Sequence, residues 1–228
     1  MQFIHENGYE PFPELAVHKL HGMRFYEAPN GLKYPSITTV LGKRPGKQEG
    51  LQRWRNRVGD EQARMISGKA ARRGTVFHNI VENYLKNTDI SDYKAEHFLA
   101  WCMFNEIKST LHNTIDAVVL QEQSMHSPKY KVAGRCDFVG EYNGKLSIVD
   151  FKTTTTEKKE EWIEDYFIQC AAYATMFEEH TGRAVDDIVI LMVAENGTVQ
   201  IYEKKTADYL PQLEEIMDEF YLNLDLDK

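Results

Sequence analysis

The sequence predicts an α/β protein in which helices flank a mixed central sheet, and three observations support this fold class. The chain has 228 residues, 42% of them hydrophobic, which is enough for one substantial core. Helical periodicity dominates residues 48–112, whereas residues 115–154 are rich in Val, Ile and aromatic side chains. Asn-Gly pairs, which favour tight turns, separate several of the predicted strands. We therefore expect an antiparallel meander, with further strands, at the centre of the sheet.

The first half of the chain is predicted to be mainly helical. A hairpin turns at Asn30-Gly31, and a basic helix follows over about residues 48–70. Another helix is expected to begin near residues 74–75, where Thr75 is a suitable cap. An amphipathic helix over about residues 92–112 completes this half.

The second half is predicted to supply the sheet. Asn143-Gly144 joins two of its strands as a tight hairpin, and Asn196-Gly197 separates the last two. Strands are predicted over residues 115–125, 130–142, 145–154, 188–195 and 198–204, with helices over about 160–180 and at the acidic carboxyl end. No internal repeat or linker divides this series of elements.

Charge is distributed unevenly along the chain. The formal net charge of −8 argues at first against a nucleic-acid partner, because phosphate binding draws on Lys and Arg. Residues 43–73, however, hold ten basic side chains against three acidic ones, whereas residues 206–228 hold seven acids against Lys228. This asymmetry is typical of a protein with one anion-facing surface, although two ordinary solvated helix faces explain it equally well.

Several classes of protein are not expected from this sequence. The three cysteines, Cys102, Cys136 and Cys170, lie far apart without CxxC spacing, so neither disulfides nor a zinc or iron-sulfur site is predicted. No stretch approaches the roughly 18 apolar residues of a membrane helix, and the first 15 residues lack the pattern of a targeting peptide. No GxxxxGK[ST] loop is present to bind a nucleotide. We expect a cytoplasmic protein without a membrane partner.

Three charged residues on neighbouring strands form the candidate catalytic set. Asp150 and Lys152 alternate along one face of a strand, following apolar residues on that face. The Asn143-Gly144 turn pairs this strand with the one that carries Asp137. Two adjacent carboxylates repel unless a cation lies between them, which favours a hard divalent ion, Mg²⁺ above all. A simple Asp-Lys ion pair at a strand end, with Asp137 exposed elsewhere, is the alternative.

Phosphodiester hydrolysis requires these residue types to lie together. A metal polarises the phosphoryl oxygen and activates water, and a further cation offsets charge in the transition state. Asp137 and Asp150 are expected to hold the metal with the backbone carbonyl of Phe151. Lys152 is expected to orient the attacking water or to stabilise the developing charge.

A longer series of motifs spans residues 74–173. It consists of Gly134-x-x-Asp137, Asp150-x-Lys152 and Gln169-x-x-x-Tyr173. In order and spacing this series resembles the RecB-type branch of the PD-(D/E)xK nucleases, which implies a restriction-endonuclease-like core. The upstream segment GTVFHNIVENYL resembles the helix on which that branch carries a metal-site histidine, so the resemblance implies His78 as an additional ligand.

The same resemblance extends to softer features. Glu122 matches an acidic position found in many members, as a supporting acid. A histidine among carboxylates makes a site more favourable for Mn²⁺ than oxygen ligands alone, although a packed core histidine is the alternative for His78. The segments YPSITTVL and LQRWRNR resemble the subgroup that contains the mitochondrial genome maintenance exonuclease and related phage-encoded exonucleases. That subgroup implies degradation of single-stranded DNA from an end.

Basic and aromatic residues near the amino end are expected to contact DNA. Arg53, Trp54 and Arg55 combine guanidinium groups with an indole, a combination that suits a single strand. Arg72 and Arg73 precede the His78 segment and are expected to contact phosphates. Solvated arginines on a surface helix are the alternative for each of them.

Gln169 and Tyr173 are predicted to contact bases. They lie one turn apart on a helical stripe that also contains Tyr166 and Met176. A second stripe, from Ile163 to Phe177, is the better predicted core face, which leaves the first stripe to line a cleft. Trp162, at the start of the first stripe, is assigned to the core.

These observations predict one nuclease domain over residues 1–228. It comprises a hairpin and basic DNA-binding part over 1–73, a catalytic core over 74–205 and an acidic closing helix over 206–228. The expected activity is hydrolysis of DNA with Mg²⁺ or Mn²⁺, mainly at single-stranded ends, in DNA replication, repair or recombination in a bacterial or phage-infected cytoplasm. The alternatives are a structure-selective endonuclease and a non-catalytic DNA-binding module on the same scaffold.

Overall fold

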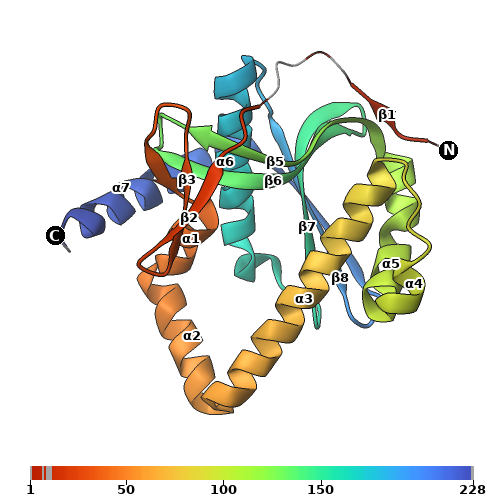
Figure 1. The fold of residues 1–228 in the computed structure, drawn as a ribbon, viewed down its shortest axis with the longest axis horizontal. Helices are drawn as coiled ribbons and strands as arrows, with labels where there is room; N and C mark the ends of the chain where they lie inside the picture. Colours follow the sequence, from red (N-terminus) through yellow and green to blue (C-terminus); the bar gives the residue numbers. More distant parts are fainter. Residues whose placement is uncertain (1, 7, 9–11, 227–228) are drawn as a thin grey trace.

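The computed structural model describes residues 2–6, 8 and 12–226, and at its centre lies a six-stranded mixed sheet (Figure 1). In spatial order its strands are β1 (Ile4–His5), β5 (Ile115–Ser127), β6 (Val132–Tyr142), β7 (Lys145–Thr154), β8 (Asp187–Ala194) and β9 (Val199–Lys205). Strands β5, β6 and β7 form an antiparallel meander, and β8 pairs with β7 in parallel. The outer strands are β9, antiparallel to β8, and β1, parallel to β5. The predicted mixed sheet with an antiparallel meander is confirmed.

Helices cover both faces of this sheet. The helical elements are α1 (Ile37–Lys43), α2 (Pro45–Val58), α3 (Asp60–Leu85), α4 (Tyr93–Glu96), α5 (Phe98–Thr114), η1 (Glu160–Trp162), α6 (Glu164–Thr181), η2 (Thr206–Asp208) and α7 (Leu210–Leu226). Helices α3 and α5 bury their apolar residues against one face, and α1, α6 and α7 against the other. Within the described ranges, none of these helices has the length and apolar character needed to cross a membrane. The predicted acidic closing helix corresponds to α7. Residues 227–228, which were predicted to belong to it, lie outside the described residues.

The two apolar layers explain why the inner strands are hydrophobic without a break. On β7, Ile148 belongs to the core beneath α6, whereas its neighbour Val149 belongs to the core beneath α3. The run from Ile188 to Val193 on β8 alternates between the same two cores. Successive side chains of a strand point to opposite faces, so a strand covered on both sides needs apolar residues at every position.

The amino-terminal part adds a small antiparallel sheet of β2 (Ala16–Leu20), β3 (Met23–Glu27) and β4 (Lys33–Pro35). The predicted hairpin at Asn30-Gly31 joins β3 to β4, but its loop spans residues 28–32 and the residue with positive φ is Gly31. The Asn143-Gly144 turn is tighter, since both residues have positive φ and Tyr142 pairs directly with Lys145. Strand β2 was not predicted.

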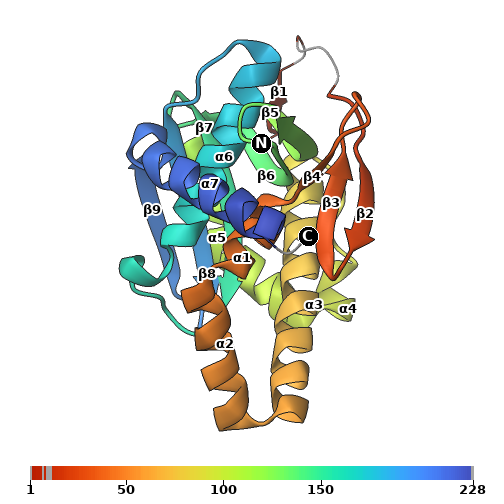
Figure 2. The same cartoon turned by 90° about the vertical axis from the view of Figure 1, so that its left-hand side faces the viewer.

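The prediction of a basic helix over 48–70, followed by a second start near residue 74, is wrong. The chain bends at Gly59, whose φ of 85° ends α2, and residues 60–85 then form one helix. Gly74 and Thr75 lie inside α3, because a single glycine costs only about 1 kcal/mol in a helix that the core anchors at Phe77 and Ile80. The expected boundary after residue 73 falls within this helix. Helix α2 and the amino-terminal part of α3 project together from the body of the molecule (Figure 2).

Candidate active site

The candidate site lies where β6 and β7 stop pairing. The last pair of their ladder joins Phe138 to Val149, which leaves Asp137 beside the next residues of β7. Asp137 Oδ2 accepts a hydrogen bond from the backbone nitrogen of Phe151 at 3.0 Å. The predicted approach of Asp137 to the strand of Asp150 and Lys152 is therefore present in the structure, and it follows from the tight turn at residues 143–144.

Asp150 and Lys152 form a buried ion pair on β7. Asp150 is 1% exposed and its Oδ2 contacts Lys152 Nζ. Burial raises the pKa of Asp150 to about 6, with the charge of Asp137 adding to the rise and that of Lys152 opposing it. Burial also lowers the pKa of Lys152, but the carboxylates of Asp150 and Asp137 outweigh it and raise this pKa above its ordinary value. Lys152 therefore remains a cation at neutral pH.

A second group of side chains meets beside this pair. His78 on α3, Glu122 on β5 and Asp137 on β6 each offer a ligand atom, and these atoms all lie within 4.8 Å of one another. His78 Nδ1 lies 3.4 Å from Asp137 Oδ1 and 3.5 Å from Glu122 Oε1. We call His78, Glu122 and Asp137 the ligand group. One imidazole nitrogen and two carboxylates fit the coordination chemistry of Mn²⁺ and of Mg²⁺.

The charges of the ligand group are mutually stabilising without an ion. Burial lowers the pKa of His78, but the charge of Asp137 and the hydrogen bonds that the imidazole donates to Asp137 and Glu122 reverse this effect and raise the pKa to about 10. Burial raises the pKa of Asp137, and the charge of His78 and its hydrogen bond outweigh burial, so this pKa falls below its ordinary value. A positive charge between two acids is thus a property of the site.

The expected metal ligands are only partly brought together. Asp137 and His78 lie in the ligand group, where Glu122, expected as a supporting acid, joins them. Asp150 is adjacent, but its two oxygens face Gln169 and Lys152. The Phe151 backbone carbonyl remains a predicted ligand.

Glu122 reaches the ligand group through an unusual backbone conformation. Its φ is 47°, in the left-handed region, although its neighbours Gln121 and Gln123 pair regularly with β6. A non-glycine residue held in this region costs on the order of 1–3 kcal/mol, and such residues cluster at functional sites. Nothing in the local sequence indicates this conformation.

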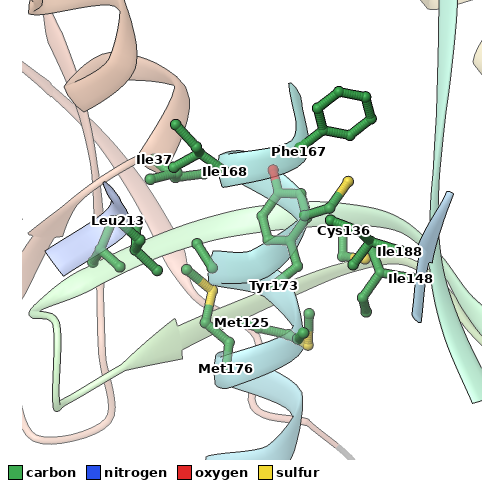
Figure 3. Packing of buried hydrophobic residues seen from close by; sticks show 14 of the residues in the cluster. Ile37, Met125, Cys136, Ile148, Phe167, Ile168, Tyr173, Met176, Ile188 and Leu213 are labelled. Carbon is green, nitrogen blue, oxygen red and sulfur yellow. The ribbon is translucent and has the colours of Figure 1, made fainter. Parts of the chain in front are cut away.

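Gln169 and Tyr173 lie behind the site and do not line a cleft. They are 7% and 2% exposed, and Tyr173 lies among buried residues that include Ile37 and Cys136 (Figure 3). The predicted exposed stripe is therefore wrong, because α1, α7 and the sheet enclose α6 on several sides. Trp162, assigned to the core, is instead 62% exposed.

The burial of these two residues gives them a different relation to the site. Gln169 Nε2 donates to Asp150 Oδ1 at 2.9 Å and lies 3.2 Å from the hydroxyl of Tyr173. Contact of Gln169 and Tyr173 with bases is not compatible with this packing. The structure instead indicates that they fix the orientation of the Asp150 carboxylate.

Gly134, the first residue of the Gly134-x-x-Asp137 motif, makes room for Tyr173. A Cβ atom at this position would lie 2.6 Å from Cε1 of the Tyr173 ring and 3.2 Å from Ile37 Cγ2. Residues with a side chain would displace the ring and, through Gln169, the support of Asp150. The motif therefore has a packing requirement as well as its acid.

We expect Gly134→Ala to lower the free energy of unfolding by about 1–3 kcal/mol, the usual cost of overpacking a core. Urea denaturation of purified protein measures this change. Gly46→Ala is the matched control, because a Cβ at Gly46 meets nothing within 4 Å. Equal stability of the two variants would contradict the close packing of Tyr173 on Gly134.

The predicted DNA-contacting residues lie in different environments. Arg53 and Arg55 are exposed on α2, with Trp54 half-buried between them, and Arg72 is exposed on α3. Arg73 is held by an ion pair with Glu195 and lies 3.3 Å from Thr153 Oγ1, with only 10% of its side chain exposed. Its guanidinium already has protein partners, because β7 and β8 bring Thr153 and Glu195 against α3, and its contact with phosphate stays a prediction.

Two residues at the site were given no individual role from the sequence. The Lys152 ammonium lies 4.8 Å from the centre of the Tyr166 ring, and Arg135 Nε lies 2.7 Å from Glu122 Oε2. Tyr166 precedes Gln169 by one helical turn, which was a usable signal. For Arg135 the signal was its position two residues before Asp137 on the same strand.

Comparison with known proteins agrees with this geometry. Residues 48–225 match the model of the PD-(D/E)XK nuclease superfamily. The mitochondrial genome maintenance exonuclease 1 of Homo sapiens is 27% identical over 148 residues, which cover 61% of this chain and 42% of the human protein. The Mus musculus protein of the same name is 26% identical over 200 residues, covering 79% and 58%. The chain thus spans about half the length of these relatives. Because the matched region covers most of its residues, this chain belongs to the PD-(D/E)XK nuclease superfamily.

Proposed function

We propose that this protein is a metal-dependent DNA exonuclease that acts on single-stranded ends. The observation that carries the proposal is the meeting of the ligand group with the Asp150–Lys152 pair at one strand edge. Membership of a nuclease superfamily supports phosphodiester hydrolysis as the reaction. The names of the human and mouse relatives support DNA as the substrate and an exonucleolytic mode.

His78, Glu122 and Asp137 would hold the divalent ion, Mg²⁺ or Mn²⁺, with Asp150 and the Phe151 carbonyl beside it. When bound, such an ion polarises the phosphoryl oxygen and lowers the pKa of a coordinated water. The charges of Glu122 and Asp137 would then be balanced by the ion, and His78 would bind it as the neutral imidazole. A neutral imidazole is the form in which histidine binds a metal.

Lys152 would stabilise the charge that develops on the phosphate or orient the attacking water. The ion pair with Asp150 keeps the Lys152 side chain protonated, and the ring of Tyr166 lies against the ammonium group. Gln169 and Tyr173 hold the Asp150 carboxylate from behind. Groups that are already fixed need little reorganisation during the reaction, which is the main advantage of an enzyme site over water.

The residues on the projecting helices are evidence for the proposal that the substrate is single-stranded. Arg53, Trp54, Arg55 and Arg72 lie on α2 and α3, and α3 also carries His78. Arginines together with an aromatic ring bind unstacked bases and backbone with little dependence on sequence. We propose that this surface guides a strand toward the ligand group.

End-labelled single- and double-stranded DNA, incubated with Mg²⁺, Mn²⁺ or a chelator, tests the proposal. We expect products only with metal, preference for the single strand, and one labelled end degraded first. Circular single-stranded DNA is the matched control, because an exonuclease that requires an end leaves it intact. Cleavage of the circle would replace the exonuclease with an endonuclease, and no cleavage under any condition would contradict a nuclease.

A further inference from the structure

Arg135 lies at the ligand group but has no part in holding the ion. It precedes Asp137 by two residues on β6 and pairs with Ser124 on β5. Its Nε lies 2.7 Å from Glu122 Oε2, while 54% of its side chain is exposed. A guanidinium group bound through Nε still has N–H groups on its two terminal nitrogens that can donate to a further acceptor. Because more than half of the Arg135 side chain is exposed, these donors can be reached by a ligand.

Glu122 connects this arginine to the ligand group. Its Oε1 faces His78 at 3.5 Å, whereas its Oε2 faces Arg135. The carboxylate is 15% exposed, and the backbone that carries it has the left-handed φ of 47°. One half-buried acid thus contacts both a cation donor and a ligand side chain, and it does so through a conformation that costs stability.

Neutralising Glu122 does not require Arg135, because a divalent ion held by the ligand group would balance the charges of Glu122 and Asp137. Arg135 lies on β6 and contacts Glu122 on β5, whereas Lys152 lies on β7, so this further cation adds positive charge on the β5 side of the site. Guanidinium groups bind phosphate through two parallel hydrogen bonds, which fixes both the position and the orientation of the anion.

We propose that Arg135 binds a backbone phosphate of the DNA strand next to the bond that is cut, and that Glu122 positions it. This inference rests on the proposed nuclease function and adds a substrate contact on β6. Lys152 on β7 and Arg135 on β6, held toward β5 by Glu122, would then contact different phosphates of one strand. Arg135 is a binding residue, and Glu122 is both a ligand and a positioning residue.

The experiment measures binding of a short single-stranded oligonucleotide by fluorescence anisotropy with Mg²⁺ present. Cleavage is prevented by the paired substitution Asp150→Asn with Lys152→Met, and Arg135→Gln is added to that background. We expect Arg135→Gln to weaken binding about tenfold and to reduce the salt dependence of log Kd by about 0.7, the value for one phosphate contact on a single strand. Arg183→Gln, just beyond the carboxyl end of α6, is the control with the same loss of charge, and we expect it to bind unchanged.

Combining neutral linkages in the DNA with the Arg135 substitution identifies the phosphate that Arg135 contacts. Neutral methylphosphonate linkages are placed one at a time along the oligonucleotide, and one position should weaken binding of the background protein about tenfold. At that position alone, Arg135→Gln should show no further loss. Glu122→Gln should abolish the same position-specific effect, because Arg135 is then no longer held in place. Loss of a metal ligand without displacement of Arg135 would instead weaken binding at all positions alike. Arg135→Lys should retain part of the affinity, since it keeps the charge but loses the fork.

Two outcomes would overturn the inference, and they differ from failure of the proposed function. If the unmodified protein cleaves DNA while Arg135→Gln and Arg183→Gln bind equally well, Arg135 does not contact the substrate. If Arg135→Gln adds the same loss at every methylphosphonate position, it acts on the fold and not on one phosphate. If the unmodified protein neither binds nor cleaves DNA, both the inference and the proposed function fail.

Discussion

Lys152→Met should lower the rate of DNA cleavage by on the order of 10³-fold, the effect of removing one charge-stabilising donor from an enzyme site. Methionine preserves most of the volume of lysine but removes the ammonium that contacts Asp150. Single-turnover assays with end-labelled DNA measure the rate. Cleavage at the unmodified rate would exclude Lys152 from the chemistry.

The same substitution should also change stability, and the two effects need to be separated. Removing Lys152 leaves a buried carboxylate without its partner, which costs about 3–5 kcal/mol. Because burial already raises the pKa of Asp150 to about 6, its charged form is disfavoured in the folded protein. Without Lys152 this pKa rises further, so the stability of the variant increases as the pH falls through it, when Asp150 takes up a proton.

Asp150→Asn together with Lys152→Met is the matched control for the fold. This pair removes both charges, so it should recover most of the stability lost in Lys152→Met while remaining inactive. Thermal unfolding at pH 5 and pH 8 compares the three proteins. An inactive and stable paired variant shows that the loss of cleavage does not come from unfolding.

Asp137→Asn should abolish both cleavage and the binding of Mn²⁺. Asp137 is the carboxylate of the ligand group closest to His78, with 3.4 Å between His78 Nδ1 and Asp137 Oδ1. Isothermal titration of the metal-free protein with Mn²⁺ measures the binding. Asp60→Asn, exposed at the start of α3, loses the same charge and should bind the metal normally.

The same variant gives a readout that does not depend on metal. The charge of Asp137 raises the pKa of His78 to about 10, so its removal should lower that pKa. Nuclear magnetic resonance of the imidazole protons in metal-free protein follows this titration. An unchanged pKa of His78 would contradict the contact between these two side chains.

The central strands and part of the site could be predicted because both depend on local pattern. Alternation along residues 145–154 places Asp150 and Lys152 on one face, and the Asn143-Gly144 turn fixes which strand lies beside them. These relations follow from the period of a strand and from the preference of one dipeptide for positive φ. The fold class followed from the same signals.

The remaining site depends on contacts between distant segments. Arg73 is paired because β8 brings Glu195 against α3, a separation of more than 100 residues. Gln169 and Tyr173 are buried because α1 and α7 close over α6, and a helix covered on several sides shows no single apolar stripe. Glu122 depends on one backbone angle inside a strand, which propensity does not encode.

Helix α2 buries no side chain in the protein core, although it carries three of the residues expected at the substrate. Substitutions at such positions usually change stability by less than about 0.5 kcal/mol. The sequence of this helix can therefore change during evolution with little loss of stability, while the ligand group and the sheet stay constant. Preference for a different nucleic acid can evolve on this scaffold without a compensating change in its core.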